Sequence, residues 1–224
     1  METEIKLRMS DEINLLAILE HPLVTRLLMP DSRRETELVN VYYDTAGRTL
    51  TANRMTLRLR KEGDLRSVTL KTGNVAIDGL HQRFEWTAGF PEDWDDNLRE
   101  GLDTGWFKRE ATSIGDPDAQ LQAALKLLKN QPLDVVCESR INRVTLDIGY
   151  GDSLMELALD RGELIAGELT ETVCELEIEL KEGDVRDLIE LGQDMQAQLA
   201  AVPEPLSKYA RCLLLLEKQK QTQA

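Results

Sequence analysis

The first residues of the chain alternate between ionisable side chains and less polar ones. The ionisable side chains take the even positions Glu2, Glu4, Lys6 and Arg8. Because successive side chains of a β-strand point to opposite faces, this pattern predicts a strand with one fully charged face. Taken alone, the pattern is typical of an amphipathic strand whose charged face meets water.

A second strand with a charged face is predicted near the other end of the chain. Residues 175–180 alternate Glu with Leu or Ile, which places Glu175, Glu177 and Glu179 on one face. Three carboxylates at every second position repel one another unless cations lie among them. We therefore expect positive groups close to this strand.

The overall charge limits the partners that the chain can bind. Its 224 residues carry a formal net charge of −14, with a pI near 4.7. Binding to nucleic acid or to an anionic membrane needs a basic surface, so neither partner is expected. The length allows one large core, and we expect a single domain over residues 1–224. The oligomeric state does not follow from these features.

The cysteines and the hydropathy pattern predict a soluble, cytoplasmic protein. Cys137, Cys174 and Cys212 are odd in number and lack metal or redox spacing, as expected for buried thiols in a reducing compartment. The longest apolar run, residues 212–216, is too short to cross a bilayer. With only His21 and His81, a histidine-rich zinc or iron site is not expected.

Period-two alternation and turn residues predict most of the strands. Strands are expected at residues 2–8, 38–43, 55–61, 67–71, 81–86, 143–148, 154–160 and 172–181, with a short segment at 163–166. Gly63-Asp64 and residues 149–152 are expected to form turns, and residues 73–79 a longer connection.

Helical spacing is expected in three regions. A helix over residues 11–20 is predicted to be capped by Ser10, with Pro22 beyond its end. A helical insertion is expected over about residues 91–130. It contains a helix with Trp94, Leu98 and Leu102, and a second helix that begins at Asp116-Pro117. Helices are also expected at about residues 184–219.

About eight or nine strands joined mostly by short turns predict an α+β fold, an eight-stranded antiparallel β-barrel with flanking helices. A barrel of about eight strands has an interior just wide enough for side chains or one small ligand. If the helices cover an apolar outer face, the charged rows must point into the barrel. The barrel interpretation therefore reverses the usual placement of charge.

Under this interpretation the interior contains both signs of charge. Its acidic residues are Glu2, Glu4, Glu85, Asp160, Glu175, Glu177 and Glu179. Its basic residues are Lys6, Arg8, Arg58, Arg60, Lys71, Arg83, Arg143, Lys208 and Arg211. Arginine and lysine suit phosphate oxygens, and carboxylates with few histidines suit a hard divalent cation, Mg²⁺ or Mn²⁺. A polyphosphate bound with its metal ions needs both sets.

This series resembles the CYTH domain, the triphosphate tunnel metalloenzyme family. The family signature Glu-x-Glu-x-Lys is matched by Glu2, Glu4 and Lys6. The resemblance continues through Tyr42-Tyr43-Asp44, Arg58-x-Arg60, Lys71, Arg83-x-Glu85, Arg143, Leu159-Asp160, residues 175–179 and Lys208. It implies an eight-stranded tunnel that binds triphosphate and hydrolyses or transfers it with a divalent metal.

The resemblance also implies roles for individual residues. The metal ligands would be Glu2, Glu4, Glu85, Asp160, Glu175, Glu177 and Glu179. The phosphate-binding residues would be Lys6, Arg8, Arg58, Arg60, Lys71, Arg83, Arg143 and Lys208. Catalysis, by attack of water on a terminal phosphoryl group, would depend on Glu4, Lys6, Arg58, Arg60, Lys71 and Lys208.

Residues 79–83 and 174–180 look most like bacterial inorganic triphosphatases, which implies hydrolysis of inorganic triphosphate to pyrophosphate and phosphate. Thiamine triphosphatase and class IV adenylyl cyclase activity are alternatives within the family. Class IV cyclases usually carry a His-Phe pair shortly before the acidic motif, whereas here Met1 directly precedes Glu2. A polyphosphate- or nucleotide-binding module without catalysis is an alternative of another kind.

Some of these residues also have a structural interpretation. Surface ion pairs explain three charged residues equally well: Arg8, Arg211 and Glu156. Residues 42–44 are interpreted as a structural strand end, since aromatic residues favour strands and Asp favours turns. Trp86 falls on the apolar face and is interpreted as core.

Overall fold

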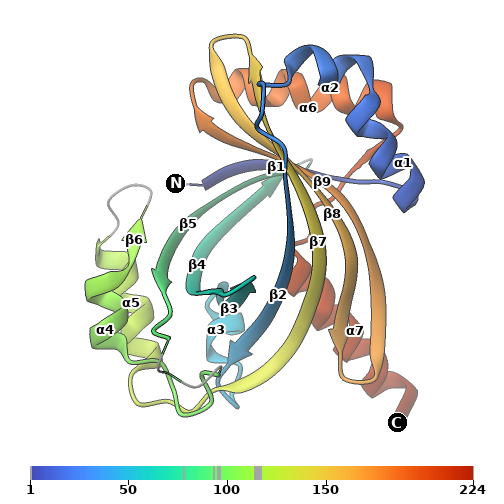
Figure 1. The fold of residues 1–224 in the computed structure, drawn as a ribbon. Helices are drawn as coiled ribbons and strands as arrows, with labels where there is room; N and C mark the ends of the chain where they lie inside the picture. The colour runs from blue at the N-terminus through green and yellow to red at the C-terminus, as the bar shows by residue number, and fades with distance from the viewer. Residues whose placement is uncertain (1, 78, 93, 95–96, 114–117, 224) are drawn as a thin grey trace.

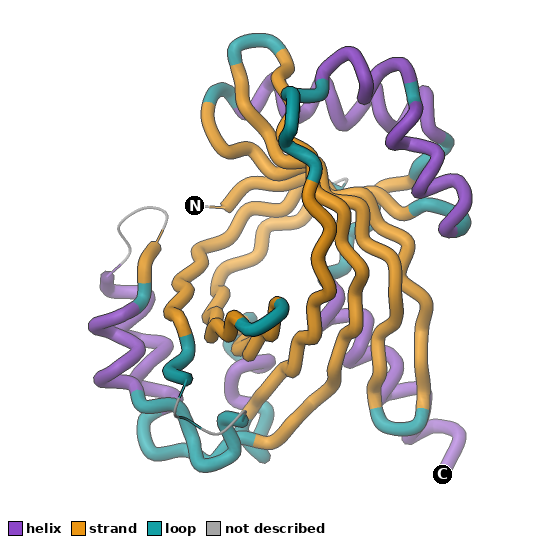
Figure 2. The backbone as a smooth tube through the Cα atoms, viewed as in Figure 1, coloured by secondary structure: helices purple, strands orange, loops and turns teal. Residues whose placement is uncertain are grey.

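Eight strands form a closed antiparallel β-barrel in this computed structural model, which describes residues 2–77, 79–92, 94, 97–113 and 118–223 (Figures 1 and 2). Around the barrel the strands are β1 (Glu2–Arg8), β9 (Leu169–Glu182), β8 (Ser153–Ala166), β7 (Asp134–Tyr150), β2 (Arg34–Asp44), β3 (Met55–Glu62), β4 (Leu65–Ile77) and β5 (Leu80–Gly89). Two short strands extend the sheet, β6 (Thr112–Ser113) on β5 and β10 (Val202–Pro203) on β1. The expected barrel is confirmed.

The barrel closes where β1 pairs with both β9 and β5. Glu2 lies opposite Arg83 on β5, and Glu4 lies opposite Glu179 on β9. The first strand therefore joins two segments that are far apart in the sequence. This closure brings the charged face of β1 beside the charged faces of both partners.

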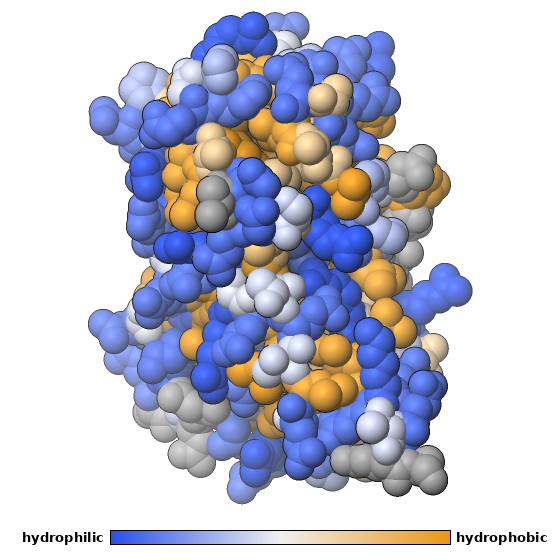
Figure 3. Space-filling view, turned by 90° about the vertical axis from the view of Figure 1, so that its right-hand side faces the viewer, coloured by the Kyte–Doolittle hydropathy of each residue, from blue (hydrophilic) through white to orange (hydrophobic). Residues whose placement is uncertain are grey.

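Helices cover the apolar outer face of the barrel on two sides (Figure 1). The helices α1 (Glu12–Ala17), η1 (Ile18–Glu20), α2 (Pro22–Leu27) and α6 (Val185–Leu199) pack against β1, β7, β8 and β9. The helices α3 (Thr49–Ala52), α4 (Thr104–Glu110) and α5 (Asp118–Leu128) pack against β3, β4 and β5. Hydrophilic residues predominate on the surface seen in Figure 3, as the large net charge requires.

The last helix, α7 (Lys208–Gln223), packs differently because the inner face of the barrel changes character along its strands. On β8 the inward row that contains Asp160 continues as Gly162, Leu164 and Ala166. Tyr209, Cys212 and Leu215 of α7 join these apolar residues in one buried cluster. The helix thus occupies one end of the barrel interior, and the charged rows line the remainder.

Several predicted elements are confirmed with longer bounds. The turns at residues 63–64 and 149–152 lie between β3 and β4 and between β7 and β8. The two segments expected at 154–160 and 163–166 form the single strand β8, and β2 and β7 begin at Arg34 and Asp134, earlier than expected. Cross-strand pairing extends these strands beyond the reach of the local alternation.

Other local predictions are wrong. Residues 97–103 form no helix, and Leu98 and Leu102 pack against α4 and α5 from a loop, so their spacing reflects burial rather than helical structure. The carboxylate of Asp11, rather than Ser10, caps α1 by accepting the Asn14 N–H at 2.8 Å. Pro22 begins α2, and β4 continues to Ile77 in place of a connection at 73–79. The Asp116-Pro117 cap lies outside the described residues.

No helix in the described part of the chain is both long and apolar enough to span a bilayer.

Candidate active site

The inward rows of the barrel enclose a cavity of about 320 Å³. Ligand pockets commonly begin at about 300 Å³. The predicted site residues among its lining are Glu2, Glu4, Lys6, Arg58, Arg60, Lys71, Arg83, Glu85, Arg143, Asp160, Glu177, Glu179 and Lys208. The charged rows therefore face inward.

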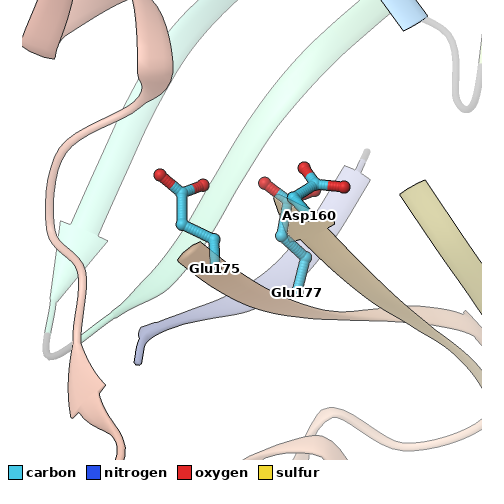
Figure 4. A group of neighbouring side chains, drawn as sticks. All are labelled: Asp160, Glu175 and Glu177. Atoms are coloured by element: carbon cyan, nitrogen blue, oxygen red, sulfur yellow. The ribbon is translucent and has the colours of Figure 1, made fainter. Parts of the chain in front are cut away.

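Three carboxylates lie close together on the neighbouring strands β8 and β9 (Figure 4). One oxygen each from Asp160, Glu175 and Glu177 lies within 4.8 Å of the others. Asp160 comes from β8, whereas Glu175 and Glu177 come from β9, where period-two alternation places them on the same face. All three residues are buried. Such a group is stable only with cations beside it.

Lys208, the first residue of α7, supplies one of these cations. Its Nζ lies 2.8 Å from Asp160, 2.5 Å from Glu175 and 2.9 Å from Glu177. Burial by itself lowers the pKa of the Lys208 ammonium, but the three carboxylates outweigh burial and hold this pKa well above its usual value. An ammonium group thus occupies the point at which the carboxylates meet.

The Glu177 carboxylate contacts three cations at once. It accepts hydrogen bonds from Lys6 Nζ at 2.7 Å, Arg143 Nη2 at 2.6 Å and Lys208 Nζ at 2.9 Å. Burial raises the pKa of the Glu177 carboxyl, yet Lys208, Lys6 and Arg143 together hold it well below its usual value. Arg143 also forms a bidentate pair with Asp160, at 2.6 and 2.7 Å.

The carboxylates at the start of β1 are paired in the same way. Glu2 accepts from Arg83 Nε at 2.5 Å and from Lys71 Nζ at 3.0 Å. Glu4 contacts Arg83 and lies 3.3 Å from Lys6 Nζ. Burial raises the pKa of Glu2, but Lys71 and Arg83 outweigh it and hold this pKa well below its usual value. Glu85 pairs with Lys71.

Two guanidinium groups on β3 differ from the other cations. Arg60 Nε donates to the side-chain oxygen of Asn40 at 2.8 Å, and Arg58 Nη2 donates to Thr69 Oγ1 at 3.2 Å. Neither arginine has an ion pair among the described residues, and Arg58 Nε has no hydrogen-bond partner there. Burial and the neighbouring charges of Arg58 and Arg143 lower the pKa of Arg60 to about 9. In the described part of the chain, this wall therefore carries two guanidinium groups without a carboxylate in ion-pair contact.

One predicted phosphate-binding residue lies outside the cavity. The side chain of Arg8 is 56% exposed and lies 3.9 Å from Glu204. β1 pairs with β5 only as far as Ile5 and then pairs with β10 at Leu7 and Arg8. Arg8 therefore projects beyond the charged interior and does not line the cavity, so this geometry gives its predicted role in phosphate binding no support.

The structure also decides the positions of three other charged residues. Glu175 is fully buried but does not line the cavity, because Arg211 and Lys208 cover its carboxylate. Arg211 lies inside the fold rather than on the surface, and donates to Glu171 at 2.6 Å. Glu156 lies at the cavity, 3.3 Å from the exposed Arg34. Trp86 is core, as interpreted.

Sequence reasoning missed several lining residues: Leu38, Asn40, Tyr42, Thr56, Ile141, Lys181, Ser207 and Tyr209. Asn40 had a usable signal, because Asn is disfavoured in the middle of a strand unless its amide has a partner. Lys181 continues the inward row of Glu177 and Glu179. Tyr209 gave no such signal, since its place depends on where α7 enters the barrel.

Comparisons with known proteins agree with this geometry. The CYTH domain family model matches residues 1–213. An inorganic triphosphatase of Haemophilus influenzae is 29% identical over 220 residues, which cover 97% of this chain and 56% of that protein. The chain thus spans about half the length of this curated relative.

Solved structures share the fold. A Hippeastrum protein described as an adenylyl cyclase candidate with a dominant triphosphatase activity superposes with a TM-score of 0.64 at 16% identity, covering 94% of both chains. A Bacillus halodurans adenylate cyclase candidate superposes with a TM-score of 0.54 at 13% identity, covering 92% of this chain and 96% of the other. With its barrel, its inward charged rows and the match over residues 1–213, the chain belongs to the CYTH domain family.

Proposed function

We propose that this chain hydrolyses inorganic triphosphate to pyrophosphate and phosphate with the help of a divalent cation, Mg²⁺ or Mn²⁺. The guanidinium groups of Arg58 and Arg60 carry this proposal. They have no ion pair among the residues that the structure describes, and they share one cavity with the carboxylates. Arginine forks suit phosphate oxygens. The name of the Haemophilus influenzae relative adds support.

The shape of the cavity favours inorganic triphosphate over thiamine triphosphate or ATP. Among the described lining residues the aromatic side chains are Tyr42 and Tyr209. Their rings lie 5.4 Å apart and pack against each other, and Trp86 is buried in the core. An adenine or thiazolium ring commonly binds against an aromatic or apolar surface. Because α7 already fills the apolar end of the barrel, little such surface is left.

The donor set fits a hard divalent cation. The carboxylates that reach the cavity offer only oxygen ligands, as Mg²⁺ and Mn²⁺ prefer. The residues that would hold the ion are Glu2, Glu4, Asp160, Glu177 and Glu179, with Glu85 beside them. Glu175 is a poorer candidate because it lies behind Lys208. A bound divalent ion would supply charge neutralisation and a more acidic water.

The chain's own cations and carboxylates exchange partners when substrate binds. Without substrate, Lys6, Arg83 and Arg143 neutralise carboxylates on nearby strands of the barrel. A triphosphate anion offers them new oxygen partners, which frees the carboxylates for divalent cations while the total charge stays balanced. Phosphoryl transfer depends mainly on such positioning and charge stabilisation. The lysines and arginines thus hold the non-bridging oxygens during attack by water.

A phosphate-release assay tests the proposal. Inorganic triphosphate, thiamine triphosphate and ATP are compared with Mg²⁺, Mn²⁺ or EDTA present. We expect release from inorganic triphosphate to exceed release from the two organic triphosphates, and to stop in EDTA. Tight triphosphate binding without release would instead identify a non-catalytic binding module. Faster release from thiamine triphosphate would contradict the argument from the cavity shape.

The Arg60→Ala variant is expected to bind triphosphate at least tenfold more weakly than the wild type, while its affinity for divalent cations changes less than twofold. A hydrogen bond to an ionised group contributes about 1.5–3 kcal/mol, which corresponds to about tenfold or more in affinity. Calorimetric titration checks both affinities. Arg140→Ala is the control, because Arg140 lies on β7 with a side chain that is 61% exposed. Unchanged triphosphate affinity in Arg60→Ala would remove Arg60 from the binding site.

We also propose that the protein acts in the cytoplasm on a small-molecule substrate. Three free, buried cysteines support a reducing compartment. The net charge of −14 supports the expectation that nucleic acid is not a partner.

A further inference from the structure

The first turn of α7 is held from two sides of the barrel. On the β9 side, Arg211 donates to Glu171 at 2.6 Å. On the β2 side, the ring of Tyr209 packs against the ring of Tyr42 at a centroid distance of 5.4 Å. Lys208 directly precedes Tyr209 in the sequence. The orientation of the helix therefore decides where the Lys208 ammonium lies.

A directed chain of hydroxyl groups holds Tyr209. Its Oη lies 2.8 Å from Thr51 Oγ1, which in turn donates to Asp44 Oδ2 at 2.7 Å. A threonine hydroxyl has one proton, and Thr51 gives it to Asp44, so Thr51 accepts a hydrogen bond from Tyr209. Burial raises the pKa of Tyr209 to about 12, so the phenol keeps its proton at neutral pH.

The chain of hydrogen bonds ends at the carboxylate of Asp44, which is held firmly in place. Asp44, the last residue of β2, is fully buried. Its Oδ1 accepts the backbone N–H groups of Thr45 at 2.7 Å and Leu50 at 2.8 Å, and its Oδ2 accepts that of Thr51 at 3.0 Å. A buried carboxylate with this many donors has little freedom to move. α3 and the end of β2 thus hold Thr51, the hydrogen-bond acceptor of Tyr209, in a fixed position.

We propose that Asp44, Thr51 and Tyr209 are positioning residues for the candidate active site. Their hydrogen bonds prevent α7 from turning about its axis and so keep Lys208 Nζ between Asp160 and Glu177. Neighbouring residues of a helix are joined rigidly through the backbone, so a rotation that moves Tyr209 also moves the Lys208 Cα, from which the ammonium must reach the carboxylates. The effect on turnover rests on the proposed function. The position of Lys208 can be measured without turnover.

The Tyr209→Phe variant tests the hydrogen bonds from Tyr209 to Asp44, because it keeps the aromatic ring and removes the hydroxyl. We expect acylation of Lys208 by acetic anhydride, measured by peptide mass spectrometry, to rise at least fivefold. Lys220, which is exposed on the same helix, is the internal reference. Phosphate release is expected to fall about tenfold. Thr51→Val removes the same hydrogen bond and should have the same effects, whereas Thr51→Ser keeps the hydroxyl and should behave like the wild type. The Tyr209→Phe/Thr51→Val double variant should be no worse than either single variant.

Tyr150→Phe is the matched control. Its hydroxyl donates to Asp194 of α6 at 3.2 Å, outside the barrel interior, so Lys208 acylation should not change. Unchanged Lys208 acylation in Tyr209→Phe overturns the proposal, even if the unfolding temperature falls, because such a variant shows a structural role alone. Equal increases at Lys208 and Lys220 also overturn it. If Tyr209→Phe does not fold, Thr51→Val decides. If the wild type releases no phosphate, the proposed function fails while acylation still decides the positioning.

Discussion

The Glu4→Gln variant is expected to lose metal-dependent phosphate release by about a hundredfold or more while the chain stays folded. Glu4 is 4% exposed and reaches the cavity from β1, beside the proposed phosphate-binding cations. Glutamine has the same shape but no charge, so it is a poor ligand for a divalent cation. Removal of one preorganised polar group that stabilises a transition state typically costs about a hundredfold to a thousandfold in rate.

The protein should tolerate this change because both cations beside Glu4 keep another partner. Arg83 retains Glu2 at 2.5 Å, and Lys6 retains Glu177 at 2.7 Å. Phosphate release over a series of Mg²⁺ concentrations, together with circular dichroism melting, checks both parts. Glu138→Gln is the control, since Glu138 lies on a barrel strand with a 37% exposed side chain. Near-normal release from Glu4→Gln would remove Glu4 from the catalytic assignment.

The Glu177→Gln variant is expected to be destabilised by about 3–5 kcal/mol at neutral pH, the range seen when one partner of a buried ion pair is removed. Glu177 accepts hydrogen bonds from three buried cations, Lys6, Arg143 and Lys208. Each of them keeps another carboxylate in Glu177→Gln, but all three lose a partner at once, whereas Glu4 contacts only two cations among the described residues. Free energies of unfolding from urea denaturation check this expectation.

Glu179→Gln is the matched comparison, two residues further along the same inward row. Glu179 pairs only with Lys181 at 2.8 Å among the described residues, and that lysine side chain is 38% exposed. Burial raises the pKa of Glu179, so its charged form adds no stability at neutral pH. We expect a change within about 1 kcal/mol. Similar losses of unfolding free energy in both variants would show that the three cations beside Glu177 do not account for its effect on stability.

The difference between the wild type and Glu177→Gln should also depend on pH. The folded-state pKa of Glu177 lies well below the ordinary value of 4.5, so the wild type binds fewer protons when folded than when unfolded. The contribution of Glu177 to the free energy of unfolding is fully present above pH 4.5 and is lost as the pH falls through the pKa of the folded state. Glutamine does not titrate. The difference should therefore shrink below pH 4.5, and a difference that stays constant in acid would contradict this explanation.

Much of the fold and site could be predicted because strand alternation is a local property. Residues i and i+2 of a strand share a face whatever the strand pairs with, so Glu2 and Glu4 could be grouped before any partner was known. Helix predictions were weaker. Leu98 and Leu102 have helical spacing but lie in a loop, because a buried loop also needs apolar residues at intervals.

The position of Arg8 illustrates why alternation does not suffice at strand ends. Its parity matches that of Glu4 and Lys6, but β1 exchanges β5 for the short strand β10 before reaching it. The exchange depends on Val202 and Pro203, which lie close to the other end of the chain. No residue near Arg8 in the sequence indicates that β1 changes its partner strand there.

The sequence by itself determined most of the charges that belong to the interior, since alternation and composition are properties of neighbouring residues. Only the tertiary structure decided which charges neutralise each other. Lys6 and Glu177 lie 171 positions apart and meet at 2.7 Å only because the barrel closes in one register. The same closure leaves Arg58 and Arg60 without carboxylate partners among the described residues and places Lys208 at the meeting point of three carboxylates. Pairing depends on distance in space, which local sequence does not encode.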